Sequence, residues 1–204
     1  MSLQTILNNL GVGPKPDAPG PDEPKDAMVD LETLGTDPYA PILAIGACAF
    51  NFDEAPITDI FYQTVDVESC LELGMRASGS TLKWWMQQSD AARSEAFNSP
   101  LAVGLPDALD LFTEWWNSRP LHFWGNSARF DCGLLEAAYK TCHKLVPWHW
   151  PRERDYRTIK HLPGAHSITL QRFGTHHNAL DDAISQALHL RSIFRALKLD
   201  ATTL

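Results

Sequence analysis

Two carboxylates, Asp30 and Glu32, lie two residues apart in the mostly apolar segment 27–35. In an extended strand they point to one face, whereas Val29 and Leu31 point to the other. Burying two like charges is costly unless a cation compensates them. Hard divalent cations such as Mg²⁺ or Mn²⁺ prefer carboxylate oxygens. The spacing therefore indicates a candidate metal site, although a solvated pair on an edge strand has the same pattern.

Three later side chains are also suited to metal or proton chemistry. Asp131 lies in the first turn of a predicted helix, directly after the predicted strand 121–125. A carboxylate there stabilises the helix dipole, but ligand sites of α/β sheets are also built at such junctions. His177 precedes the last predicted helix, and Asp182 follows it by five residues. His176 and Asp181 are their direct neighbours, and helical phase does not decide cleanly between the neighbouring residues.

The predicted elements that would position these side chains define an α/β fold. The apolar run 41–50 is typical of a central strand that is covered on both faces, and 57–65 is a further strand candidate. With segment 27–35 they predict an antiparallel meander of three strands. Helices are expected from residue 80, over 106–117, over 129–143 and over 178–197.

The chain divides into an N-terminal extension and one domain. Residues 1–26 include a stretch rich in proline and glycine, which is typical of a linker. Residues 27–204 are long and apolar enough to form one compact domain. The seven tryptophans could lie in a buried core or at an apolar interface between subunits, so the sequence leaves the oligomeric state open.

The overall charge excludes a general nucleic-acid coating protein. The chain has 17 Lys and Arg residues and 25 Asp and Glu residues, so its formal net charge is −8. The four cysteines form no C-x-x-C pair, which favours reduced thiols and a cytoplasmic location. We find neither a signal peptide nor an apolar run long enough to span a bilayer.

The interval 144–177 reverses this acidic balance. Six Lys or Arg residues and two acidic residues give it a charge of +4, and it also contains four of the aromatic side chains. Cations that hold phosphates, interleaved with rings that stack on bases, are typical of single-stranded nucleic-acid binding. A solvated face with some core aromatics remains the alternative. Earlier in the chain, Trp84 and Trp85 cannot share one helix face, so one of them is expected to line a cleft.

Three motifs in order resemble those of the DEDDh 3′-to-5′ exonucleases, which are DnaQ-like members of the ribonuclease H-like superfamily. These motifs are Asp30-x-Glu32, Asn126-x-x-x-Phe130-Asp131 and His177-x-Ala179-x-x-Asp182. Two shorter segments, one around Trp84-Trp85 and the other 154–158, resemble the branch of phage exonuclease A and bacterial 3′-5′ exoribonucleases. The resemblance implies a ribonuclease H-like mixed sheet, in which parallel strands follow the meander and helices flank both.

The resemblance also implies an activity and a site. The expected enzyme removes nucleotides from the 3′ ends of single-stranded DNA or RNA as nucleoside 5′-monophosphates, in the cytoplasm of a bacterium or a phage-infected host. Asp30, Glu32, Asp131 and Asp182 would hold two Mg²⁺ or Mn²⁺ ions, and His177 would deprotonate the attacking water. The expected nucleic-acid contacts are Thr33, Leu34, Trp85, Asn126, Phe130, Arg154 and Arg157.

Two other functions fit parts of the sequence. The same fold could serve as a catalytically inactive nucleic-acid-binding or protein-interaction module, but such a module has no physical reason to keep four mutually repelling carboxylates. An endonuclease of the same fold is the second alternative, and the histidine motif favours the exonuclease. A serine or thiol hydrolase is disfavoured because the chain lacks a nucleophile elbow.

Overall fold

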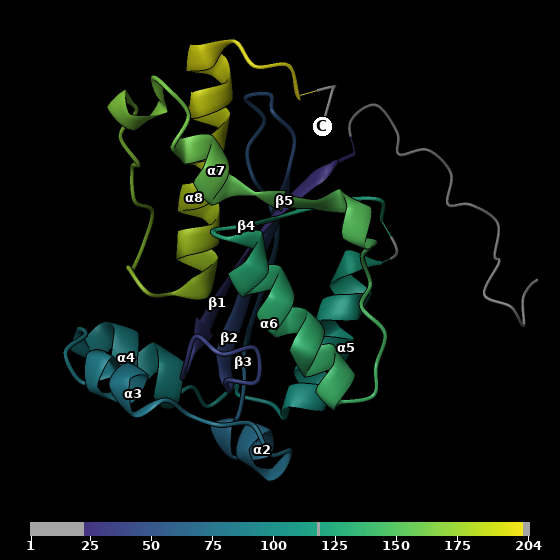
Figure 1. Ribbon diagram of the computed structural model, residues 1–204, viewed down its shortest axis with the longest axis vertical. Coiled ribbons are helices and arrows are strands. Elements are labelled where there is room, and N and C mark those ends of the chain that lie inside the picture. Colours follow the sequence, from purple (N-terminus) through teal and green to yellow (C-terminus); the bar gives the residue numbers. More distant parts are fainter. Residues whose placement is uncertain (1–22, 118, 202–204) are drawn as a thin grey trace, which may run out of the picture.

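In the computed structural model, which describes residues 23–117 and 119–201, five strands form one mixed sheet. The strand order is β3-β2-β1-β4-β5 (Figure 1). The pairs β1/β2 and β2/β3 are antiparallel, whereas β1/β4 and β4/β5 are parallel. This arrangement confirms the predicted meander and the mixed α/β sheet. The strands are β1 (Asp26–Thr33), β2 (Ile42–Phe50), β3 (Asp59–Thr64), β4 (His122–Gly125) and β5 (Glu153–Asp155).

Helices cover both faces of the sheet (Figure 1). On one face, α5 and α6 pack on Ala27, Val29 and Leu31 of β1. On the other face, α8 packs on Met28 and on neighbouring residues of β2 and β4. The helices are α2 (Val67–Glu72), α3 (Gly79–Trp85), α4 (Asp90–Phe97), α5 (Leu105–Trp116), α6 (Ala128–Thr141), α7 (Tyr156–Lys160) and α8 (Ala179–Leu197).

Strand alternation decides which face receives the two carboxylates of β1. Asp30 and Glu32 share the parity of Met28, so they lie on the face covered by α8. Gly46 of β2 lies opposite Asp30 in the register. A Cβ atom at Gly46 would come within 2.2 Å of the backbone of Ala179 and Leu180. The missing side chain therefore lets the first turn of α8 approach the sheet beside Asp30.

The sequence located the long elements together with β4 and α3, and it missed most of the other short ones. The predicted helices 106–117, 129–143 and 178–197 correspond to α5, α6 and α8. The short helices α2, α4 and α7 and the three-residue strand β5 were not predicted as separate elements. The predicted boundary between extension and domain stays a prediction, and residues 1–22 lie outside the described residues. Within the described ranges, no helix is both long and apolar enough to cross a membrane.

Candidate active site

Asp30, Glu32 and Asp182 converge where β1 meets the first turn of α8. One carboxylate oxygen of each lies within 4.8 Å of the others. Glu32 and Asp182 are buried, and Asp30 is partly buried. The strand supplies two carboxylates on one face and the helix supplies the third.

Asp131 approaches Asp30 from the start of α6. It is 1% exposed, and its Oδ2 atom is buried without a hydrogen-bond partner among the described residues. A Cβ atom at Gly125, the last residue of β4, would lie 2.8 Å from this oxygen. Glycine at the strand end therefore lets Asp131 reach the site, and its unpartnered oxygen needs a proton or a cation.

Burial and mutual repulsion both oppose ionisation of these carboxyl groups. Burial, followed by the charge of Asp182, raises the pKa of Asp30 to about 7. The pKa values of Glu32 and Asp131 are raised well above their usual range, first by burial and then by the charge of Asp30. A divalent cation would favour the ionised forms. The residues present therefore fit a metal site.

One neutral side chain and one cationic side chain each orient one of the carboxylates. Gln186 donates from Nε2 to Oδ1 of Asp30 at 2.7 Å, one helical turn after Asp182. Arg172 donates from a guanidinium nitrogen to Oδ1 of Asp182 at 2.9 Å. Both contacts lower the pKa of Asp30, the amide by hydrogen bonding and the guanidinium by its charge.

The histidine segment, residues 173–177 before α8, is hydrogen-bonded to that helix. The backbone N–H of His177 donates to Asp182 Oδ2 at 3.1 Å, and the N–H of Thr175 donates to Asp181 Oδ2 at 2.6 Å. His177 has a positive φ of 66°. Its ring lies 4.7 Å from that of Trp84. Partial burial, followed by the charge of His176, lowers the pKa of His177, so its imidazole is neutral near pH 7.

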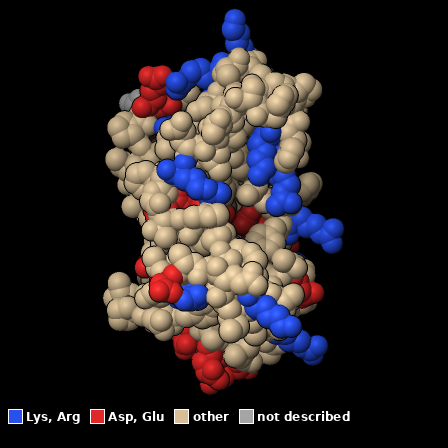
Figure 2. Space-filling view, turned by 90° about the vertical axis from the view of Figure 1, so that its left-hand side faces the viewer, with Lys and Arg blue, Asp and Glu red and all other residues tan. Residues whose placement is uncertain are grey.

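Two hollows meet at this cluster. Figure 2 shows acidic atoms at the bottom of a depression in the middle of one side of the molecule, with Lys and Arg side chains around it. The larger hollow has a volume of about 940 Å³ and the smaller about 280 Å³. Asp30, Asn126 and His177 line both of them. A third hollow of about 390 Å³ lies between β1 and α3 and is lined by Glu32, Thr33, Ser80, Thr81, Trp84 and Phe130, among others.

The predicted nucleic-acid residues divide into two groups. Thr33, Asn126, Phe130 and Arg157 line at least one of the hollows. Leu34, Trp85 and Arg154 line none of these three hollows.

The assignment of Trp85 is wrong, because its side chain is 2% exposed and its indole N–H donates to the Thr33 carbonyl. Trp84, which is 40% exposed, is the tryptophan that lines the cleft. Leu34 is also buried, in the small core cluster that contains Trp85. Both side chains pack in the core beside the cleft, and neither is exposed to a ligand.

The basic interval contributes only part of its cations to the hollows. Arg157, Lys160 and Arg172 line them. Arg154 instead donates to the carbonyl groups of Pro151 and Glu153, and Lys144 pairs with Asp110. Among the aromatics, Trp148 and Tyr156 are buried in the core.

Two polar contributors to the site were missed in the sequence. Gln186 lies four residues after Asp182, so helical spacing alone could have placed both on one face. Lys160 donates to Asn126 Oδ1 at 3.0 Å from the short helix α7, which had no recognisable sequence pattern.

The fold and the arrangement of the carboxylates with His177 are those expected of a DEDDh 3′-5′ exonuclease. The family model of the Rv2179c-like 3′-5′ exoribonuclease domain matches residues 25–194. The chain therefore belongs to this family, and the predicted resemblance to DEDDh exonucleases is confirmed. A sequence comparison with curated proteins finds no significant match.

Solved structures of similar fold include several nucleases. The nuclease domain of 3′hExo, a DEDDh family member bound to rAMP, is 13% identical with a TM-score of 0.55, covering 88% of this chain and 94% of that one. Cell-death related nuclease 4 is 12% identical with a TM-score of 0.54, covering 85% and 65%. E. coli exonuclease I in complex with a dA16 oligonucleotide is 13% identical with a TM-score of 0.55, covering 84% and 42%. The chain thus spans less than two thirds of the last two proteins.

Proposed function

We propose that this protein hydrolyses the 3′-terminal phosphodiester bond of single-stranded RNA and releases nucleoside 5′-monophosphates. The observation that carries the proposal is the convergence of four carboxylates and the His177 imidazole at the junction of two open hollows. Membership in an exoribonuclease domain family favours RNA over DNA. The four free thiols fit a reducing compartment such as the cytoplasm.

The carboxylates would hold two Mg²⁺ or Mn²⁺ ions. Asp30, Glu32 and Asp182 would hold one, and Asp131 with Asp30 would hold the other, since Asp131 lies outside the three-residue cluster. When bound, such ions activate water and neutralise charge on the attacked phosphate and the leaving oxygen. Gln186 keeps Asp30 in place through its amide hydrogen bond.

His177 would accept the proton of the attacking water. A base must be unprotonated to act, and the lowered pKa keeps this imidazole neutral at working pH. The hydrogen bond from the His177 backbone to Asp182 keeps the base next to a proposed metal ligand. Trp84 packs edge-on against the imidazole and restricts its rotation.

The hollow between β1 and α3 would receive the terminal nucleoside. Phe130 and Trp84 provide aromatic surfaces for a base, and Ser80 and Thr81 provide hydroxyl groups for the sugar. The larger hollow continues past Asn126 and Arg157, which would contact the preceding phosphates. This path leads the strand inward with its 3′ end at the carboxylates.

The test is a time course on matched RNA and DNA oligonucleotides labelled at the 5′ end, in Mg²⁺, in Mn²⁺ and in chelator. We expect a metal-dependent ladder that shortens from the 3′ end, with RNA degraded faster, and chromatography should identify nucleoside 5′-monophosphates. A folded protein that gives no ladder with either metal would contradict the proposal. Faster degradation of DNA would contradict its choice of sugar.

A matched pair of variants separates the site from helix stabilisation. Asp131 and Asp107 both lie in the first turn of a helix, but Asp107 is exposed and away from the cluster. Asp131→Asn should abolish the ladder, whereas Asp107→Asn should leave it unchanged. Equal activity of the two variants would mean that Asp131 serves only the helix dipole.

A further inference from the structure

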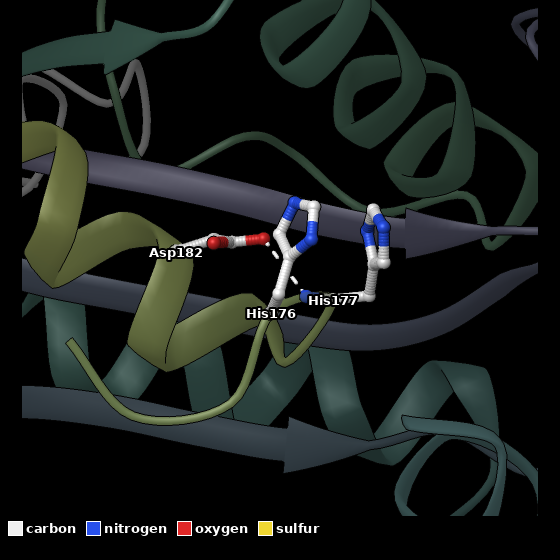
Figure 3. Close-up of side chains that lie close together, drawn as sticks. All are labelled: His176, His177 and Asp182. Atoms are coloured by element: carbon white, nitrogen blue, oxygen red, sulfur yellow. Dashed lines mark hydrogen bonds between the residues drawn. The ribbon is translucent and has the colours of Figure 1, made fainter. Parts of the chain in front are cut away.

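His176, which the proposed exonuclease reaction does not use, forms a second cluster with His177 and Asp182. Its ring stacks on that of His177, with centroids 3.7 Å apart and an angle of 28° between the planes. One ligand atom from each of His176, His177 and Asp182 lies within 4.8 Å of the others. Figure 3 shows the two imidazoles side by side, with the Asp182 carboxylate extending from α8 toward them.

The donor set differs in kind from that of the carboxylate cluster. Imidazole nitrogens are preferred by borderline transition metals such as Zn²⁺, whereas Mg²⁺ and Mn²⁺ prefer oxygen. Two histidines and one carboxylate, with a remaining position open to water, match the ligands of many zinc sites. We propose that His176, His177 and Asp182 bind a Zn²⁺-class transition-metal ion.

The backbone already holds the three donors in place. The segment is fastened to α8 by hydrogen bonds from Phe173, Thr175 and His177 to side chains of that helix. Zinc–ligand bonds of about 2.0–2.2 Å require the donors to lie closer together than the 4.8 Å that bounds their separation here. Because His176 is exposed, rotation of its side chain can close this gap.

Asp182 can serve this ion while keeping its present contacts. Its Oδ1 accepts from Arg172 and its Oδ2 accepts from the backbone of His177. Each carboxylate oxygen has a second lone pair available.

An ion at this position would inhibit the exonuclease, a consequence that rests on the proposed function. It would take the lone pair of His177 that is needed to accept a proton. It would also engage Asp182, which is one of the proposed Mg²⁺ ligands. Inhibition by Zn²⁺ should therefore persist in saturating Mg²⁺.

The direct test measures Zn²⁺ binding to the full chain by competition with a chromophoric chelator, in saturating Mg²⁺. Loss of an outer-sphere partner already costs about 10–100-fold in metal affinity, so His176→Ala should weaken binding by at least about tenfold. His166→Ala is the matched control, since it removes another exposed histidine outside the cluster. Visible absorption of bound Co²⁺ should change in His176→Ala and stay unchanged in the control.

The outcomes separate the metal site from the proposed activity. Unchanged Zn²⁺ affinity in His176→Ala, or displacement of Zn²⁺ by Mg²⁺, would overturn the site and place the ion at the carboxylates. Binding that depends on His176 without loss of exonuclease activity would overturn the inhibitory role. Binding that depends on His176 in a protein without exonuclease activity would support the site and reject the proposed function. Melting temperatures of both variants confirm that they are folded.

Discussion

At the scale of single residues, the neighbours Asp181 and Asp182 have different partners. Asp182 faces Asp30 and Glu32, whereas Asp181 accepts a hydrogen bond from the backbone of Thr175. Asp182→Ala should lower the initial rate in saturating Mg²⁺ by more than about 100-fold, because it removes a ligand and not an outer partner. Asp181→Ala should lower it by no more than about tenfold, because it loosens the histidine segment. A larger loss in Asp181→Ala would reverse the assignment.

Glu32 gives a prediction for stability because its pKa is raised by burial and by neighbouring carboxylates. The folded state without metal then binds this proton more tightly than the unfolded state does. The contribution of Glu32 to stability is therefore highest at low pH and falls as pH rises from the unfolded pKa of about 4.3 toward the folded one. In Glu32→Gln the side chain cannot ionise, so this loss of stability with rising pH is absent.

In chelator, Glu32→Gln should therefore melt at a higher temperature than the unaltered protein at pH 8, and the difference should shrink toward pH 5. Saturating Mg²⁺ should reverse the order at pH 8, because the variant loses a metal ligand. Melting curves at several pH values measure both effects. A constant difference across this range would contradict a raised pKa at Glu32.

At the scale of elements, Gly46 controls the position of α8 on the sheet. A Cβ atom there would lie 2.2 Å from the backbone of Ala179, and Asp182 lies one turn further along the helix. Gly46→Ala should cost about 1–3 kcal/mol in the free energy of unfolding by overpacking. It should also weaken Mg²⁺ binding, because Asp182 moves away from Asp30.

Gly133→Ala is the matched control for stability. A Cβ atom at Gly133, inside α6, meets no heavy atom within 4 Å. Alanine is favoured over glycine in helices by about 1 kcal/mol, so this variant should be at least as stable as the unaltered protein. Urea denaturation and Mg²⁺ titration of both variants measure the effects. Unchanged stability and Mg²⁺ affinity in Gly46→Ala would show that α8 is not held at this distance.

The elements also show what could be predicted from the sequence. Strand alternation correctly placed Asp30 and Glu32 on one face, because period two is fixed by backbone geometry. The long helices α6 and α8 were located by their apolar spacing. Helical phase separated Trp84 from Trp85 but did not tell which faces the core, since that depends on packing against α4 and β2. The role of Gly46 also depends on a neighbour distant in the sequence.

At the scale of the whole molecule, an acidic protein with a net charge of −8 has to attract a polyanion through few cations. The charge reversal in the interval 144–177 indicated a nucleic-acid-binding segment, with a solvated face as the alternative for its single residues. Of the cations in this interval, only Arg157, Lys160 and Arg172 line the hollows, and Arg172 already pairs with Asp182. Arg129 and Lys140 of α6 also line the larger hollow, and Lys140 pairs with Glu136. We therefore expect few phosphate contacts and a weak dependence of binding on salt.

The salt dependence of binding can be measured variant by variant. Each phosphate contact to a single strand contributes about −0.7 to the slope of log K against log salt concentration. Arg157→Ala and Lys160→Ala should each make the slope shallower by about 0.7. Lys144→Ala should leave it unchanged, because Lys144 pairs with Asp110 outside the hollows. Fluorescence anisotropy of a labelled RNA oligonucleotide in the absence of Mg²⁺ measures the slopes without cleavage. Equal effects of all three variants would mean that the strand follows the whole basic interval and not the path past Asn126.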